Sequence, residues 1–193
     1  MRGFRRIAPT AAILVLVVCV GISFGRVEAA SCGWFEYRNP VHGFRICVPA
    51  DLTVSEEAES LVVQGAVVSF GSTFDRSIRT DGSRTNLHDV RVAIGVIDVN
   101  SADGKIVQQT ARHGDTTIVR GIEFTVYRNV EGAVGNRYET LSYVTFVEGR
   151  RFEIALFLHD SDPDCYGPGQ VVLFDREAIH EWFETMICSF SVL

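Results

Sequence analysis

The sequence has 193 residues, with 24 acidic against 18 basic side chains and a formal net charge of −6. This length suits one domain with a continuous hydrophobic core. An acidic surface repels phosphate backbones and anionic lipids, so the composition argues against nucleic acids and membrane surfaces as partners.

The N-terminal residues 1–29 have the layout of a secretory signal peptide. Arginines come first, an apolar run follows from Ala11 to about Phe24, and small residues precede Ala30. The run is shorter than the ~20 residues that a membrane-spanning helix needs. We therefore expect cleavage after Ala29, no retained membrane span, and a location in the periplasm or outside the cell.

Removal of residues 1–29 takes away four arginines and one glutamate, so the formal charge of −6 becomes −9. We expect residues 30–193 to form a single domain. A lipoprotein beginning at Cys32 is the less favoured alternative, because this cysteine lies well beyond the apolar run and lacks the usual aliphatic residue before it.

Four cysteines remain in the exported chain: Cys32, Cys47, Cys165 and Cys188. In an oxidising compartment this number predicts two disulfides, for which three pairings are possible. We favour Cys32–Cys47 and Cys165–Cys188, because a hairpin turning at "NPVH" would bring the first two cysteines to the same end. No CxxC motif is present that would indicate redox chemistry.

The first half of the domain alternates apolar and polar residues, as half-buried strands do. Strands are predicted at 34–38 and 44–48, where Phe44, Ile46 and Val48 share one face. Residues 60–74 indicate two strands about Gln64-Gly65, or one bulged strand. Residues 75–86 have almost no apolar side chains and predict an exposed loop.

The second half begins with "LHDVRVAIGVIDV" (87–99), which predicts a central strand covered on both sides. Residues 101–112 fit a short second helix, although Gly104 disfavours it. Three further strands are predicted at 122–129, 137–149 and 151–159. The first two are joined by "VEGAVGN" and the last two by a tight turn near Gly149, so they are expected to be antiparallel neighbours.

The last segment changes its period from two to that of a helix. Apolar residues form one stripe: Ile179, Trp182, Phe183, Met186, Ile187 and Phe190. Asp175 is placed to cap the helix and Glu177 to interact with its dipole. The sequence therefore predicts an α+β fold, an antiparallel sheet with a C-terminal helix packed on one face.

Four stretches carry a resemblance to a known family: "YRNPVHGFRICVPADL" (37–52), "IVRGIEFTVYR" (118–128), "YVTFVEGRRFEIALF" (143–157) and the closing helix with its "SF" (189–190). Together they resemble PsbP-like and Mog1-like domains, as an exported bacterial member would. The resemblance implies a sandwich of sheet and helices that serves as a binding or assembly accessory. It brings no catalytic motif to any residue here, and the four cysteines and the long 159–174 loop depart from the family pattern.

The stretch "HDSDPDC" contains the one partial metal motif. Asp160, Asp162 and Asp164 have the spacing that begins a calcium loop, with His159 beside them. The rest of the motif fails, because Cys165 stands where the turn needs glycine and Val171 where a carboxylate is needed. We expect an acidic surface loop and no cofactor, with calcium as the alternative.

Nucleophile motifs are missing, since the chain has no GxSxG or SxxK, and its histidines form no HExxH or HxxxH. Binding candidates are Arg76, Arg79 and Arg84 in the polar loop and Tyr166 in the 159–170 loop, each of which also suits an ordinary soluble surface. We expect an exported, disulfide-stabilised binding or accessory protein for a protein or small ligand of the cell envelope. The alternatives are an inhibitor of an extracellular hydrolase that presents the 159–170 loop, or a metal-dependent hydrolase using His159 and the aspartates.

Overall fold

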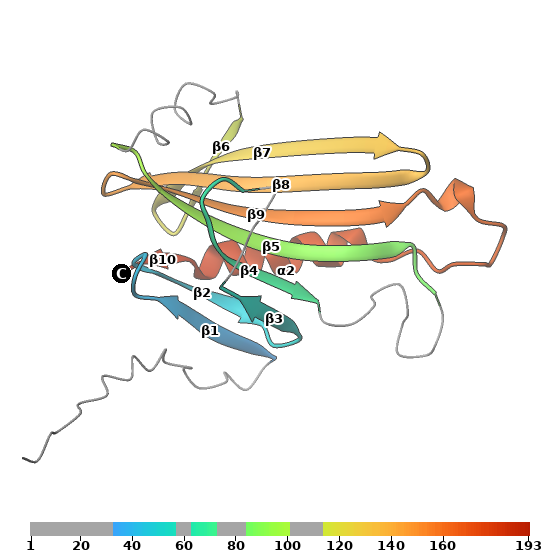
Figure 1. The fold of residues 1–193 in the computed structure, drawn as a ribbon, viewed down its shortest axis with the longest axis horizontal. Coiled ribbons are helices and arrows are strands. Elements are labelled where there is room, and N and C mark those ends of the chain that lie inside the picture. Colours follow the sequence, from blue (N-terminus) through green and yellow to red (C-terminus); the bar gives the residue numbers. More distant parts are fainter. Residues whose placement is uncertain (1–32, 57–62, 73–83, 101–113) are drawn as a thin grey trace, which may run out of the picture.

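The computed structural model describes residues 33–56, 63–72, 84–100 and 114–193. Seven strands form one antiparallel sheet in the order β3-β4-β5-β9-β8-β7-β6, here called the large sheet. Its strands are β3 (Leu52–Ser55), β4 (Ala66–Ser72), β5 (Leu87–Asp98), β6 (Asp115–Val119), β7 (Ile122–Ala133), β8 (Asn136–Val147) and β9 (Arg150–Ser161). Figure 1 shows helix α2 (Arg176–Ser189) along one face of this sheet, so the predicted α+β class is confirmed.

A smaller antiparallel sheet packs against the same core. It contains β1 (Trp34–Asn39), β2 (Phe44–Pro49) and β10 (Ser191–Val192), in the order β1-β2-β10. Phe44, Ile46 and Val48 of β2 are fully buried, as their shared face predicted. Phe190, which follows α2, packs its ring against Phe44 and thereby fixes the helix end to this sheet.

Helix α2 begins and packs as the sequence predicts. The Asp175 carboxylate accepts a hydrogen bond from the Ala178 backbone N–H at 3.0 Å, which satisfies one of the free donors of the first turn. The predicted stripe faces the sheets: Ile179, Phe183, Met186 and Ile187 are buried, and Trp182 packs partly against them. Burial of this stripe holds the helix on the large sheet.

Tight turns join the long strands of the large sheet, and the turn between β7 and β8 is shorter than the sequence predicted. Val134 and Gly135 both have positive φ, of 50° and 76°, as a two-residue turn between antiparallel strands requires. Strand β7 therefore continues to Ala133, where the sequence predicted a connection over 130–136. The strands β8 and β9 turn in the same way at Glu148-Gly149.

Several short segments complete the fold. The strands β3, β6 and β10 have four, five and two residues and were not predicted, because so few residues show no clear alternation. Within 60–74 the strand begins at Ala66, and Val63 instead packs on Ala93 and Ala155 of the large sheet. The predicted helix over 101–112 and most of the predicted loop over 75–86 lie outside the described residues.

The described cysteines, Cys47, Cys165 and Cys188, all carry free thiols. The predicted Cys165–Cys188 disulfide is therefore absent from this structure. Cys165 lies beside Gly135 at the β7–β8 turn, whereas Cys188 lies in the last turn of α2, whose 14 residues extend over about 20 Å. A disulfide needs α-carbons within about 7 Å. Cys32, and with it the predicted Cys32–Cys47 pair, lies outside the described residues.

Replacing Cys165 with serine is expected to change the free energy of unfolding by less than about 0.5 kcal/mol, because the side chain is exposed and not crosslinked. Urea unfolding of the purified, non-reduced protein measures this difference. A loss of about 2–5 kcal/mol would instead reveal a disulfide at Cys165.

Candidate functional site

The four candidate metal ligands in the "HDSDPDC" stretch do not converge on one point. They are His159, Asp160, Asp162 and Asp164. His159 and Asp160 are neighbours in β9, so their side chains lie on opposite faces of the large sheet. Asp162 instead caps the short 3-10 helix η1 (Pro163–Cys165) by accepting a hydrogen bond from the Asp164 N–H at 3.0 Å. Among the described residues, no group of three or more His, Cys, Asp or Glu side chains is arranged to hold a metal ion. Calcium binding stays a prediction, and the geometry of these side chains does not support it.

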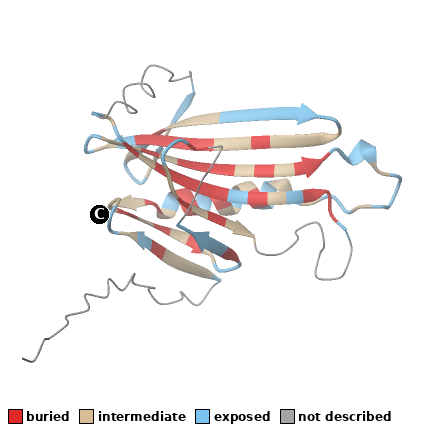
Figure 2. Cartoon of the chain, in the orientation of Figure 1, coloured by how far each residue is buried: buried red, intermediate tan, exposed pale blue. Residues whose placement is uncertain are grey.

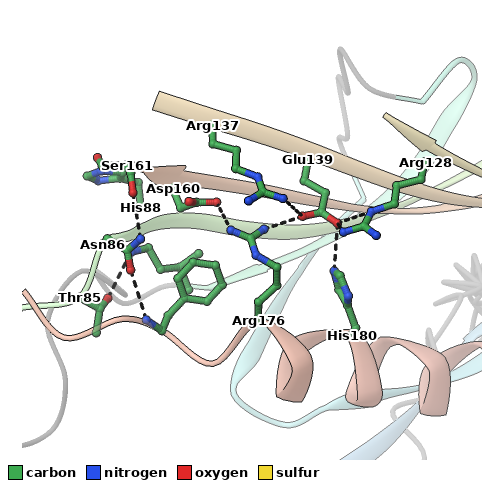
Figure 3. A network of polar contacts seen from close by, with 12 residues as sticks. Thr85, Asn86, His88, Arg128, Arg137, Glu139, Asp160, Ser161, Arg176 and His180 are labelled. Atoms are coloured by element: carbon green, nitrogen blue, oxygen red, sulfur yellow. Dashed lines mark hydrogen bonds and ion pairs between the residues drawn. The ribbon is translucent and has the colours of Figure 1, made fainter. Parts of the chain in front are cut away.

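The α2 side of the large sheet holds a cluster of buried charges (Figure 3). Asp160 is 2% exposed and accepts a hydrogen bond from Arg176 Nη2 at 2.7 Å. The other terminal nitrogen of Arg176 donates to Glu139, which is 1% exposed. Arg176, the first residue of α2, thus joins the helix to two carboxylates from neighbouring strands, β8 and β9.

Glu139 has three further neighbours besides Arg176, two arginines and one histidine. Arg128 donates to its Oε1 at 2.9 Å, and Arg137 Nη2 lies 3.6 Å from Oε2. His180 Nε2 lies 3.2 Å from Oε1 without hydrogen-bond alignment. Burial alone raises the pKa of Glu139, but the charges of Arg128, Arg176 and His180 outweigh it, and the pKa lies below its usual value. We call Arg128, Arg137, Glu139, Asp160, Arg176 and His180 the arginine cluster.

Next to this cluster, Asn86 connects the end of β9 to the chain ahead of α2. Its side-chain amide donates to the Ser161 carbonyl at 2.9 Å and accepts from the Phe174 N–H at 3.2 Å. Asn86 is buried, so these bonds satisfy an amide that would otherwise be costly to bury. The end of β9 and the approach to α2 are thereby held to the start of β5.

The opposite side of the large sheet, here called the open face, carries a row of rings from three adjacent strands. A bulge in β5 places the His88 ring 4.9 Å from that of His159 in β9. The Tyr138 ring of β8 stacks on His159 at 4.5 Å, and Phe157 lies beyond it at 6.3 Å from Tyr138. We call these four residues the ring row. Its members lie on strands of the large sheet and are at least partly exposed, so they present a preformed aromatic surface.

Hydrogen bonds fix both imidazoles of the ring row. His88 Nε2 bonds the Ser161 hydroxyl, and His159 Nε2 lies 3.1 Å from Asn136 Oδ1. Burial and the neighbouring His88 lower the pKa of His159. The carboxylates of Asp89, which Arg91 binds at 3.0 Å, and of Asp160 act in the opposite direction and offset part of this lowering.

Two of the four predicted binding candidates, Arg84 and Tyr166, belong to the described residues. Arg84 is exposed, and its carbonyl accepts a hydrogen bond from the Val172 N–H at 2.8 Å. Tyr166 is half-buried just after η1. Arg76 and Arg79 lie outside the described residues. The structure therefore gives no grouping of these four residues.

No protein-family model and no curated protein matches this sequence. Among solved structures, the chain is similar to the Ran-binding protein Mog1p of Saccharomyces cerevisiae. Their identity is 11%, the match covers 82% of this chain and 95% of Mog1p, and the TM-score is 0.50. The chain has a Mog1-like fold. The predicted resemblance to Mog1-like domains is thereby confirmed for the fold alone.

Two other solved structures align with this Mog1-like chain. A crystal structure from Bacteroides thetaiotaomicron VPI-5482 has 12% identity and a TM-score of 0.47 over 82% of this chain, which spans only 48% of that protein. The cyanobacterial PsbP of Synechocystis sp. PCC 6803 has 16% identity and a TM-score of 0.36, covering 86% of this chain and 98% of PsbP.

The Mog1-like fold brings together residues that sequence reasoning did not select. His88 lies on β5, which is distant in sequence from the hairpin of β8 and β9 that carries Tyr138 and Phe157, and only the strand register aligns the three rings. The burial of Glu139 could have been predicted from the sequence. Glu139 alternates with Leu141 and Tyr143, so it occupies a position where an apolar residue is expected. A charged residue at such a position indicates a buried partner of opposite charge.

Proposed function

We propose that this chain is an exported accessory protein without catalytic activity of its own, and that it binds a protein partner through the ring row. The observation that carries the proposal is the ring row itself, four partly exposed rings held on adjacent strands. Aromatic side chains are enriched at the centres of protein interfaces, where they bury much area at little entropic cost.

The fold agrees with this proposal. Mog1p, which has a similar fold, is a Ran-binding protein. A rigid sheet presents its side chains with little motion, so binding there requires little ordering of the protein. Export rests on the layout of residues 1–29, and a partner in the cell envelope follows from it. None of the helices in the described part of the chain has the length and apolar content needed to cross a bilayer.

The inhibitor and hydrolase alternatives have less support. An inhibitor of the expected kind needs a loop braced by a disulfide, and Cys165 has a free thiol. A hydrolase using His159 and the aspartates needs these side chains on one side of the sheet, and His159 lies opposite Asp160.

Site-specific photo-crosslinking in the source cells tests the proposal. A benzophenone side chain at Tyr138 is expected to give one discrete crosslinked partner, recovered from the exported fraction on chains that lack residues 1–29. Ile118 is the matched control, because it is 70% exposed and lies at the other end of the open face, on β6. Equal crosslinking from both positions, or crosslinks only in the cytosol on the uncleaved chain, would contradict the proposal.

A further inference from the structure

Only the first half of the outer edge of β7 is paired with another described strand. Strand β6 pairs with Ile122–Val126, and from Tyr127 to Ala133 the strand β7 is paired with β8 alone among the described strands. Figure 2 shows this half of β7 as exposed, and every residue from Arg128 to Ala133 is exposed. Alternate residues of such an edge direct unpaired N–H and C=O groups outward, where they can accept another strand.

This edge has little of the protection that sheet edges usually have. Proteins commonly protect an edge with proline, charged side chains, a bulge or a very short strand. The segment Tyr127–Ala133 has no proline, its register with β8 is continuous, and its charged side chains are Arg128 and Glu131. Val130, at its centre, is 46% exposed.

The side chains beside this edge on the α2 side are positively charged. Arg128 projects from the edge itself, and Arg137 lies opposite Gly132, which has no side chain to cover it. Their side chains are 54% and 41% exposed, so part of each guanidinium remains available. The arginine cluster has three arginines against two carboxylates, a surplus of one positive charge even with His180 neutral.

We propose that the edge Tyr127–Ala133 binds an extended acidic segment of a partner protein by strand addition. Backbone hydrogen bonds would extend the large sheet in line with β6. Alternate side chains of the added strand would face Arg128 and Arg137, where carboxylates form charge-assisted hydrogen bonds. The inference rests on the proposed function as a protein-binding accessory and adds a second contact, separate from the ring row.

A second copy of this chain fits the edge less well. On the α2 side the edge presents Arg128, Val130 and Gly132, and none of these is acidic. Antiparallel pairing of two copies through β7 keeps their α2 sides together, so it would bring no carboxylate of this edge to the arginines. The charge of the edge thus favours an acidic partner over self-association.

The test uses a fluorescein-labelled peptide with glutamate at every second position and threonine or valine between, and the same peptide with lysine in place of glutamate. Fluorescence anisotropy is expected to show binding of the glutamate peptide at least tenfold tighter than of the lysine peptide. Hydrogen exchange at alternate amides from Tyr127 to Ala133 should slow in the complex. Equal binding of both peptides, or no change in exchange, would overturn the proposal.

Two substitutions at one exposed position keep the arginine cluster intact. Val130→Glu is expected to weaken binding of the glutamate peptide about tenfold, and Val130→Lys to strengthen it. Val41→Glu makes the same change at a distant exposed valine and should have no effect. Unchanged affinity in both Val130 variants overturns the proposal, as does a wild-type dimer that Val130→Glu dissociates in sedimentation velocity. If the peptide fails to bind while the Tyr138 crosslink still forms, only the edge proposal fails.

Discussion

Replacing Arg176 with alanine is expected to lower the free energy of unfolding by about 3–5 kcal/mol, the usual cost of removing one partner from a buried ion pair. Arg176 donates to Asp160 at 2.7 Å and also to Glu139, and both carboxylates are almost completely buried. The alanine would leave Asp160 without its guanidinium partner in the interior. Urea unfolding at neutral pH measures the loss.

A second substitution separates the unpaired charge from other effects of the alanine. Asp160→Asn removes the negative charge with little change of shape, so in the Arg176→Ala background it should recover part of the lost stability. In the wild type the same change should be destabilising, and the cycle should give a coupling free energy of about 0.5–3 kcal/mol. Strict additivity of the two changes would show that Arg176 does not stabilise the fold through its contact with Asp160.

The pH dependence of this loss follows from Glu139. Its pKa is lowered in the folded protein, so the folded chain binds that proton less readily than the unfolded chain. The stabilisation is therefore complete above the usual glutamate value of about 4.3 and disappears as the pH falls through the folded value. The difference between the wild type and Arg176→Ala should accordingly shrink as the pH falls below about 4.3.

The same cluster shows where sequence reasoning reached its limit. The sequence predicted that the strand ends at His159 and that Asp160 belongs to a solvated loop, because burying an isolated carboxylate is costly. In the structure β9 continues to Ser161, and Arg176 offsets that cost from the start of the next helix. Local pattern cannot show such a pairing, since the two residues meet only after α2 has packed on the sheet.

The long strands and the helix were predictable for the opposite reason. Apart from the exposed second half of β7, each of them buries one face along its length, so the period of apolar residues appears in a short window of sequence. The helix also carries its own start signal at Asp175, and the structure confirms this cap.

The ring row on the open face could not be predicted from the sequence of any single strand. The bulge at His88 brings that ring against His159, and it depends on how β5 aligns with β9. Tyr138 is a common type of strand residue until the register of β8 sets it beside both. The ring row could therefore be recognised only from the pairing of strands.

Replacing Phe183 with alanine is expected to lower the free energy of unfolding by about 3–5 kcal/mol, the range for removing a buried phenylalanine. Phe183 is fully buried, and its ring meets that of Tyr143 at 5.8 Å, at the contact between α2 and β8. The cavity would lie where the helix stripe meets the sheet, and close packing leaves little room for collapse. Glu181→Ala, on the exposed side of the same helix, is the control and should change stability by less than about 0.5 kcal/mol. Equal losses of stability for the two changes in urea unfolding would contradict this packing of α2. Phe183→Ala could have so small an effect only if the apolar stripe of the helix faced away from the sheet.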